Sequence, residues 1–221
     1  YLDIRSFGNT GEWHNAGTGF STLKSTNRLP TVATYKRMIN AYTTYFPNTE
    51  LIYIMNVFDD DGSSEIPAEV VSYALDSAYN NYGPIGFGYR RDNWGQSTFD
   101  GILLSSNYNY SGSLRTKIRD IWKKGRITGE PSIDGANVTY NGGQYYRMAI
   151  EADSFHMSML ENGNWASYST QMGDTIRLAE KRMGYKYTLT AGSMPTTPTK
   201  NSAAAVSITW HNLGVAPMYD R

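Results

Sequence analysis

The alternation of short apolar runs with amphipathic helical patterns constrains the fold more than any other feature of this sequence. Five short segments are expected to form strands, at Tyr1–Phe7, Leu51–Val57, Ile85–Tyr89, Arg126–Gly129 and Phe155–Leu160, and Leu51–Val57 is a continuous apolar run. Helical patterns follow them at Thr34–Tyr45, Ser64–Ala78, Leu114–Lys124, Tyr145–Ala152 and Thr170–Met183. Strands that alternate with helices of about 10–15 residues are typical of βαβ units. The sequence therefore predicts an α/β fold with a parallel sheet.

The pattern changes after Gly184. Two further strands are expected at Tyr185–Thr190 and Ala203–Asn212, joined by a loop rich in Pro, Thr and Ser rather than by a helix. A two-stranded unit is only marginally stable on its own. We therefore expect one domain over residues 1–184 and the beginning of a C-terminal β-sandwich module over residues 185–221.

Five βα units are fewer than a closed barrel requires. A (β/α)8 TIM barrel has eight units and typically about 250 residues. We interpret residues 1–184 as the C-terminal part of such a barrel, with a missing N-terminal half or a second chain completing it. The alternative is an open parallel α/β sheet, although no glycine-rich phosphate-binding motif follows any of the expected strands.

The composition excludes some classes of binding partner and favours another. The 221 residues carry 20 Lys and Arg against 20 Asp and Glu, which is not the basic surface of a nucleic-acid binder. No apolar stretch reaches the roughly 18 residues that a membrane-spanning helix needs. The chain has no cysteine but has 18 Tyr, 5 Trp and 7 Phe. Aromatic faces and polar uncharged side chains suit a carbohydrate ligand.

Two isolated glutamates stand where strands are expected to end. Glu12 follows the first strand and Glu130 follows the fourth, and barrel enzymes carry their catalytic groups at the carboxyl ends of the strands. A protonated and an ionised carboxyl group are what glycoside hydrolysis needs, with a spacing that differs between retaining and inverting enzymes. The competing interpretation is that each glutamate forms a salt bridge with an arginine such as Arg90 or Arg126.

Other polar and aromatic side chains near the same strand ends are candidates for the sugar subsites. They are Trp13, His14, Asn56, Tyr89, Arg90, Asp92, Trp94, His156 and Asn162. Arg90 or Tyr89 is expected to keep Glu130 ionised, while Trp13 and Trp94 are equally well interpreted as sugar platforms or as caps over the barrel. The histidines lack metal-binding spacing, and Asp59–Asp61 matches a solvated acidic turn better than a calcium loop. We expect no metal and no cofactor.

Several short pieces carry a resemblance. They are Asp3-x-Arg5, Gly11-Glu-Trp-His14, Gly86-Phe-Gly-Tyr-Arg-Arg-Asp92, Gly129-Glu-Pro131 and the ending Thr209-Trp-His-Asn212-x-Gly214-x-Ala216-Pro217. Together they resemble the DUF4832 family of secreted bacterial proteins, which usually follow a DUF4874 segment. That family is similar to TIM-barrel glycoside hydrolases with catalytic glutamates on strands four and seven. Gly11 stands where those hydrolases usually have an Asn.

The resemblance implies roles and a location. With the first strand counted as barrel strand four, Glu12 takes the acid/base position and Glu130 the nucleophile position. The implied function is a glycoside hydrolase-like protein acting on an extracellular poly- or oligosaccharide. The implied location is extracellular or periplasmic. The alternative is a non-catalytic carbohydrate-binding or structural protein on the same scaffold.

Overall fold

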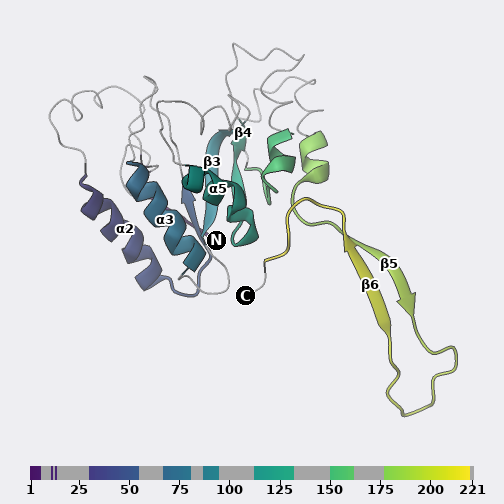
Figure 1. Cartoon of the computed structure of the whole chain (residues 1–221). Helices are drawn as coiled ribbons and strands as arrows, with labels where there is room; N and C mark the ends of the chain where they lie inside the picture. Colours follow the sequence, from purple (N-terminus) through teal and green to yellow (C-terminus); the bar gives the residue numbers. More distant parts are fainter. Residues whose placement is uncertain are drawn as a thin grey trace.

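A computed structural model of the chain describes residues 1–5, 11, 13, 30–54, 67–80, 87–94, 112–131, 150–161 and 177–219. It shows a mixed α/β arrangement in which helices pack on a four-stranded parallel sheet, with a separate two-stranded hairpin projecting from it (Figure 1). The predicted α/β class and parallel sheet are confirmed. The described residues form neither a closed barrel nor a β-sandwich.

The sheet follows the order of the chain. Its strands are β1 (Leu2–Ile4), β2 (Leu51–Ile54), β3 (Gly88–Trp94) and β4 (Ile127–Pro131). Each strand pairs in parallel with the next one, in the order β1-β2-β3-β4. The expected strand at Ile85–Tyr89 begins later, at Gly88, and continues to Trp94.

Residues 157–161 run along the free edge of β4. The carbonyl of Ile127 accepts from the backbone N–H groups of Ser158 at 2.8 Å and Met159 at 3.4 Å, and the carbonyl of Gly129 accepts from that of Glu161 at 2.7 Å. These bonds hold the segment beside β4, although it forms no regular strand. The segment therefore occupies the place of the fifth strand that was expected at Phe155–Leu160.

Three helices cover one face of the sheet. They are α2 (Val32–Tyr45), α3 (Ala68–Asn80) and α5 (Gly112–Asp120), which continues into the 3-10 turn η1 (Ile121–Lys123). Residues 150–154 and 177–182 are also helical. Each of these elements coincides with a helix that the sequence pattern predicted.

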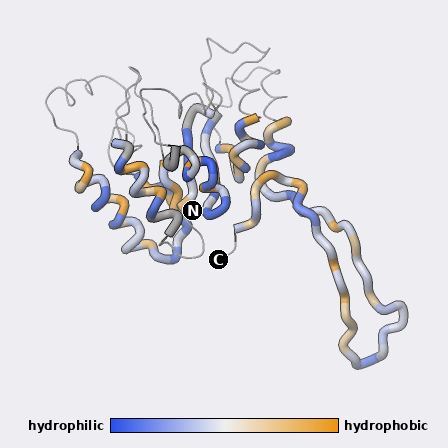
Figure 2. Tube along the Cα trace, in the orientation of Figure 1, coloured by the Kyte–Doolittle hydropathy of each residue, from blue (hydrophilic) through white to orange (hydrophobic). Residues whose placement is uncertain are grey.

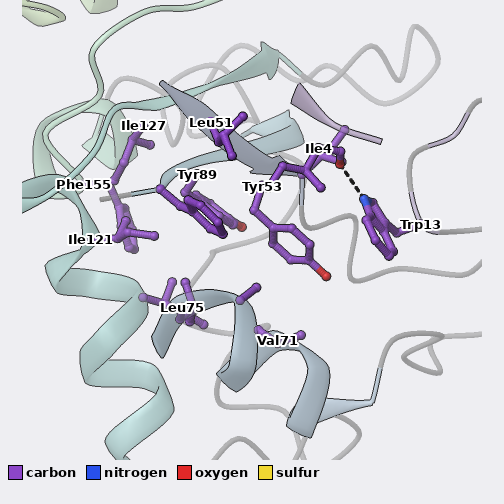
Figure 3. Packing of buried hydrophobic residues seen from close by; sticks show 14 of the residues in the cluster. Ile4, Trp13, Leu51, Tyr53, Val71, Leu75, Tyr89, Ile121, Ile127 and Phe155 are labelled. Carbon is purple, nitrogen blue, oxygen red and sulfur yellow. Dashed lines mark hydrogen bonds between the residues drawn. The ribbon is translucent and has the colours of Figure 1, made fainter. Parts of the chain in front are cut away.

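Alternate residues of the strands form the core with these helices. Ile4, Tyr53, Tyr89 and Ile127 lie in one row across the sheet and are at most 1% exposed. Figure 3 shows this row above Val71 and Leu75 of α3, with Ile121 beside it. Side chains alternate between the two faces of a strand. The strand neighbours of these core residues, including Asp3 beside Ile4 and Arg90 beside Tyr89, therefore belong to the opposite face of the sheet.

Helix α2 begins with a side-chain cap. The hydroxyl of Thr31 accepts a hydrogen bond from the backbone N–H of Thr34 at 3.2 Å. We expect Thr31→Ala to lower the free energy of unfolding by about 1 kcal/mol, because the first turn loses the hydroxyl that caps the N–H of Thr34. Urea denaturation measures the change. Thr43→Ala, near the C-terminal end of α2, is the control, because the Thr43 hydroxyl only donates to the carbonyl of Asn40 within the helix; it is expected to change stability by only a few tenths of that amount, and equal effects would contradict the capping role.

Beyond the sheet, β5 (Tyr187–Ser193) and β6 (Ser207–Asn212) form an antiparallel hairpin. Both predicted strands are present, and Figure 2 shows apolar residues along them, away from the rest of the chain. The base of the hairpin is attached to the α/β part. The N–H of Gly184 donates to Met157, and the N–H of Val215 donates to Arg182, both at 2.9 Å.

Tyr219 attaches the end of the described chain to the α/β part. Its hydroxyl donates to the carbonyl of Trp122 at 2.6 Å, and burial raises the pKa of Tyr219 to about 12. Tyrosine in the unfolded chain titrates near pH 10. The folded state therefore disfavours the phenolate, and the contribution of this group is complete below pH 10 and is lost as the pH rises towards 12. We expect the unfolding free energy of Tyr219→Phe to fall less steeply than that of the unsubstituted protein over this range. Parallel slopes in denaturant titrations would contradict the assignment.

Candidate functional site

Glu130 lies near the carboxyl end of β4, on the face of the sheet opposite to the helices. The residue before it, Gly129, has a backbone φ of 155°, a conformation that residues other than glycine rarely adopt. A Cβ at this position would overlap the carbonyl oxygen of Arg91 and the indole nitrogen of Trp94. Gly129 therefore allows β3 and β4 to approach closely beside Glu130.

Arg90 brings three carboxylates together. Its Nη2 lies 2.6 Å from Glu130 Oε1, its Nη1 lies 3.1 Å from Asp3 Oδ2, and its Nε lies 3.1 Å from Glu161 Oε2. The Arg90 side chain is 3% exposed, whereas that of Glu130 is 35% exposed. A buried guanidinium thus holds a carboxylate that solvent, and hence a ligand, can reach.

Two more side chains complete this cluster. Arg5 contacts Asp3 at 3.2 Å, and the hydroxyl of Tyr1 donates to Glu161 at 2.8 Å. Burial first, and then the hydrogen bond to the Glu161 carboxylate, raises the pKa of Tyr1 above its ordinary value. Three carboxylates against two guanidiniums leave one formal negative charge, so the cluster favours a neutral or cationic ligand over an anionic one.

The structure also decides which arginine meets Glu130. Arg126 instead binds Glu50, with its Nε 2.9 and 2.8 Å from the two carboxylate oxygens. Arg126 directly precedes β4 and Glu50 directly precedes β2, so both lie at the amino-terminal ends of these strands, away from Glu130. The predicted contact between Arg90 and Glu130 is therefore present, and a contact between Arg126 and Glu130 is not.

The aromatic candidates near the strand ends are buried. Trp13 is 0% exposed, and Tyr89 and Trp94 are each 1% exposed. The indole N–H of Trp13 donates to Ile4 at 2.6 Å (Figure 3), and that of Trp94 donates to Thr128 at 3.1 Å. Trp13 packs against Tyr53 with the ring centroids 5.5 Å apart. The structure thus corresponds to the packing interpretation of both tryptophans, and neither presents an open face for a sugar.

His156 is engaged at the base of the hairpin. Its ring stacks on Trp122 with the centroids 3.7 Å apart, and its Nδ1 lies 2.5 Å from the carbonyl oxygen of Val215. Because that oxygen can only accept, Nδ1 carries the proton. His156 therefore contacts the segment after β6 and Trp122, rather than the carboxylates around Arg90.

Several candidates lie outside the described part of the chain. These are Glu12, His14, Asn56 and Asn162, together with the Asp59–Asp61 turn. Asp92 is within β3, but its side chain is not described. Their expected roles at the sugar subsites stay predictions.

Sequence reasoning missed Asp3 and Glu161 as members of the site. The available signal was the alternation Asp3-x-Arg5 in a strand that is otherwise apolar, since charged residues on one face of a buried strand need partners. For Glu161 the signal was its position directly after the strand expected at Phe155–Leu160, which is the same kind of position that pointed to Glu130.

No protein-family model, curated protein or solved structure matches the chain. Among the described residues, no group of three or more His, Cys, Asp or Glu side chains is arranged to hold a metal ion. None of the helices in this part of the chain is long and apolar enough to cross a membrane.

Proposed function

We propose that the protein is a glycoside hydrolase-like enzyme that acts on an extracellular poly- or oligosaccharide through two carboxyl groups, Glu12 and Glu130. Glu12 is the proton donor, and Glu130 is the nucleophile or the base that activates water. The proposal combines the paired strand-end glutamates with the resemblance to DUF4832. The observation that supports it best is the state of Glu130.

Glu130 has the two properties that a nucleophile or base requires. Arg90 at 2.6 Å favours the ionised carboxylate, and the 35% exposure of the Glu130 side chain leaves it within reach of a substrate. Because Glu161 and Asp3 also bind Arg90, the guanidinium is fixed in position. A fixed charge beside the reacting carboxylate needs no rearrangement during the reaction.

The order of the strands supports a barrel as the scaffold. Each strand of the sheet neighbours the next in the chain, and α2, α3 and α5 contribute to the same core. Because parallel crossovers are right-handed, strands added in one direction place all their helices on one face. This is the arrangement along a (β/α)8 barrel, whose interior face would then carry Asp3, Arg90 and Glu130. We propose that another stretch of polypeptide, from this protein or from a second chain, completes that barrel.

The second candidate is a non-catalytic carbohydrate-binding protein on the same scaffold. It is favoured by the complete engagement of Arg90, since a network of one arginine and three carboxylates is also a way to stabilise a sheet whose interior face is polar. Turnover distinguishes the two candidates.

Activity on a panel of neutral poly- and oligosaccharides tests the proposal. We expect Glu130→Gln to lower turnover at least a hundredfold, the usual contribution of a positioned acid or base. Glu69→Gln is the control, because Glu69 is exposed on α3 and pairs with Lys36, and it is expected to leave turnover unchanged. If Glu130 is the nucleophile, azide will restore product formation in Glu130→Ala with the opposite anomeric configuration.

Two results would contradict this assignment. Turnover that survives Glu130→Gln would remove Glu130 from the reaction. Saturable glycan binding by a protein that shows no turnover, unaffected by Glu130→Gln, would favour the binding protein.

A further inference from the structure

The β5–β6 hairpin has one apolar face. Residues opposite each other in an antiparallel pair point to the same side, and the register pairs Leu189 with Trp210 and Gly192 with Ile208. Tyr187, two residues before Leu189, shares this side. We call Tyr187, Leu189, Ile208 and Trp210 the apolar face.

The other side of the hairpin is polar. Its pairs join Thr188 to His211, Ala191 to Thr209, and Ser193 to Ser207, while Tyr187 on the apolar side pairs with Asn212 at the base of the hairpin. A register shift between Leu189 and Ala191 adjusts the alternation so that the two sides stay distinct. Such a two-sided pattern is typical of a sheet that packs one side against another layer and exposes the other side to water.

Nothing in the described part of the chain covers the apolar face. Tyr187, Leu189, Ile208 and Trp210 are 46%, 54%, 52% and 58% exposed. Met194 and Val206, which lie directly beyond the Ser193–Ser207 pair towards the loop, are 70% and 61% exposed. Figure 1 shows the hairpin projecting away from the sheet and its helices. A contiguous exposed patch of this kind marks an interaction surface.

We propose that the apolar face packs against the apolar face of a second copy of this chain, related by a twofold axis, so that the two hairpins form a two-layered β unit. This inference is independent of the proposed enzymatic function. Two features favour a second copy as the partner: the exposed area of the apolar face and the absence of charged residues on it.

The exposed apolar area is comparable to the lower limit for a stable dimer interface. A large side chain presents on the order of 150–250 Å², so the four residues of the apolar face, together with the adjoining Met194 and Val206, offer roughly 500–700 Å² per copy at their 46–70% exposure. Two such faces bury about 1,000–1,400 Å² in total, which reaches the lower range of stable interfaces at about 1,200 Å². A smaller apolar patch would not suffice.

The composition of the face suits self-association. A twofold contact places the same patch of both copies together, so a charged residue near the axis would meet its own copy and repel it. The apolar face has no charged residue.

The base of the hairpin is also fixed. The side-chain oxygen of Asn212 accepts from the N–H groups of Lys186 and Gly214 at 2.8 and 3.0 Å, and its amide donates to Ala216 at 2.8 Å. A pre-ordered hairpin loses little conformational freedom on association.

Analytical ultracentrifugation of the 221-residue protein and two neighbouring variants tests the oligomeric state. Trp210→Lys places a charge on the apolar face, and Thr209→Lys places the same charge on the polar side. We expect the unsubstituted protein and Thr209→Lys to form dimers at micromolar concentration, and the dissociation constant of Trp210→Lys to rise at least a hundredfold. A monomer at all concentrations up to about 100 µM, or equal weakening by both variants, would overturn the proposal.

A cross-linking experiment keeps the proposal testable if Trp210→Lys fails to fold. The chain has no cysteine, so Ile208→Cys and Ser207→Cys each introduce a single thiol, on the apolar and polar sides. We expect a disulfide-linked dimer from Ile208→Cys under mild oxidation and monomer from Ser207→Cys. Equal yields would indicate random collision and overturn the proposal. A monomeric protein whose tryptophan fluorescence responds to a soluble neutral polysaccharide, with the response lost in Trp210→Phe, would overturn it in favour of a glycan.

Discussion

Replacing Gly129 by alanine is expected to destabilise the α/β part strongly. The added Cβ would overlap the carbonyl of Arg91 and the indole of Trp94, and the φ of 155° is strained for any residue with a side chain. Neither obstacle is the flexible end of a side chain, so relief requires that β3 and β4 separate. We expect a loss on the order of 4 kcal/mol or more from a total stability of about 5–15 kcal/mol.

Gly192→Ala is the matched control for this substitution. Gly192 also lies in a strand, but a Cβ there would have the carbonyl of Ser207 at 3.7 Å, an ordinary contact. Its stability is expected to stay within about 0.5–1 kcal/mol of the unsubstituted protein. Urea denaturation followed by circular dichroism compares the two. Similar midpoints for Gly129→Ala and Gly192→Ala would contradict the close approach at Gly129.

The second large effect is expected from Glu151→Gln. Glu151 is 7% exposed and its carboxylate lies 3.7 Å from Nη1 of Arg91, which is 1% exposed. Burial lowers the pKa of Arg91, while the nearby charge of Glu151 raises it. Removing the carboxylate leaves a buried guanidinium without this compensating charge, which costs about 3–5 kcal/mol in comparable pairs.

A double substitution separates the charge from the packing. Arg91→Met combined with Glu151→Leu removes both charges and keeps apolar volume beside Trp94, whose ring lies 5.3 Å from the Arg91 guanidinium. We expect the double variant to recover most of the stability that Glu151→Gln loses. A double variant as unstable as Glu151→Gln would show that the pair itself, rather than the uncompensated charge, stabilises the fold.

The elements of the fold were predictable because their periodicity is local. The apolar run at Leu51 and the helical spacing of Tyr35 and Ile39 each lie within one turn or one strand, and both elements are present. The two strands after Gly184 were equally predictable from their local pattern. The β-sandwich expected there needs a second sheet packed on this pair, and the described residues form only the two-stranded sheet of β5 and β6. The start of β3 at Gly88 was missed because Ile85 and Phe87 extend the apolar run beyond the paired residues.

The site was predictable only where position along a strand decides it. Glu130 was expected at a strand end and Arg90 was expected to contact it, and they meet at 2.6 Å. Trp13 and Trp94 could not be assigned in this way, since an aromatic residue after a strand can face a ligand or the core, and here burial decides for the core. Asp3 and Glu161 were missed because their meeting at Arg90 depends on tertiary contacts among β1, β3 and the segment after β4.

The way in which Arg90 uses its nitrogen atoms bears on how this sequence can diverge. Nη1, Nη2 and Nε each contact a different carboxylate, from Asp3, Glu130 and Glu161. Lysine has a single nitrogen and cannot reproduce a planar fork with three directions. Among related sequences, loss of the arginine should therefore be accompanied by loss of acidic residues at all three partner positions, and a lysine at position 90 should be rare even where the overall charge is preserved.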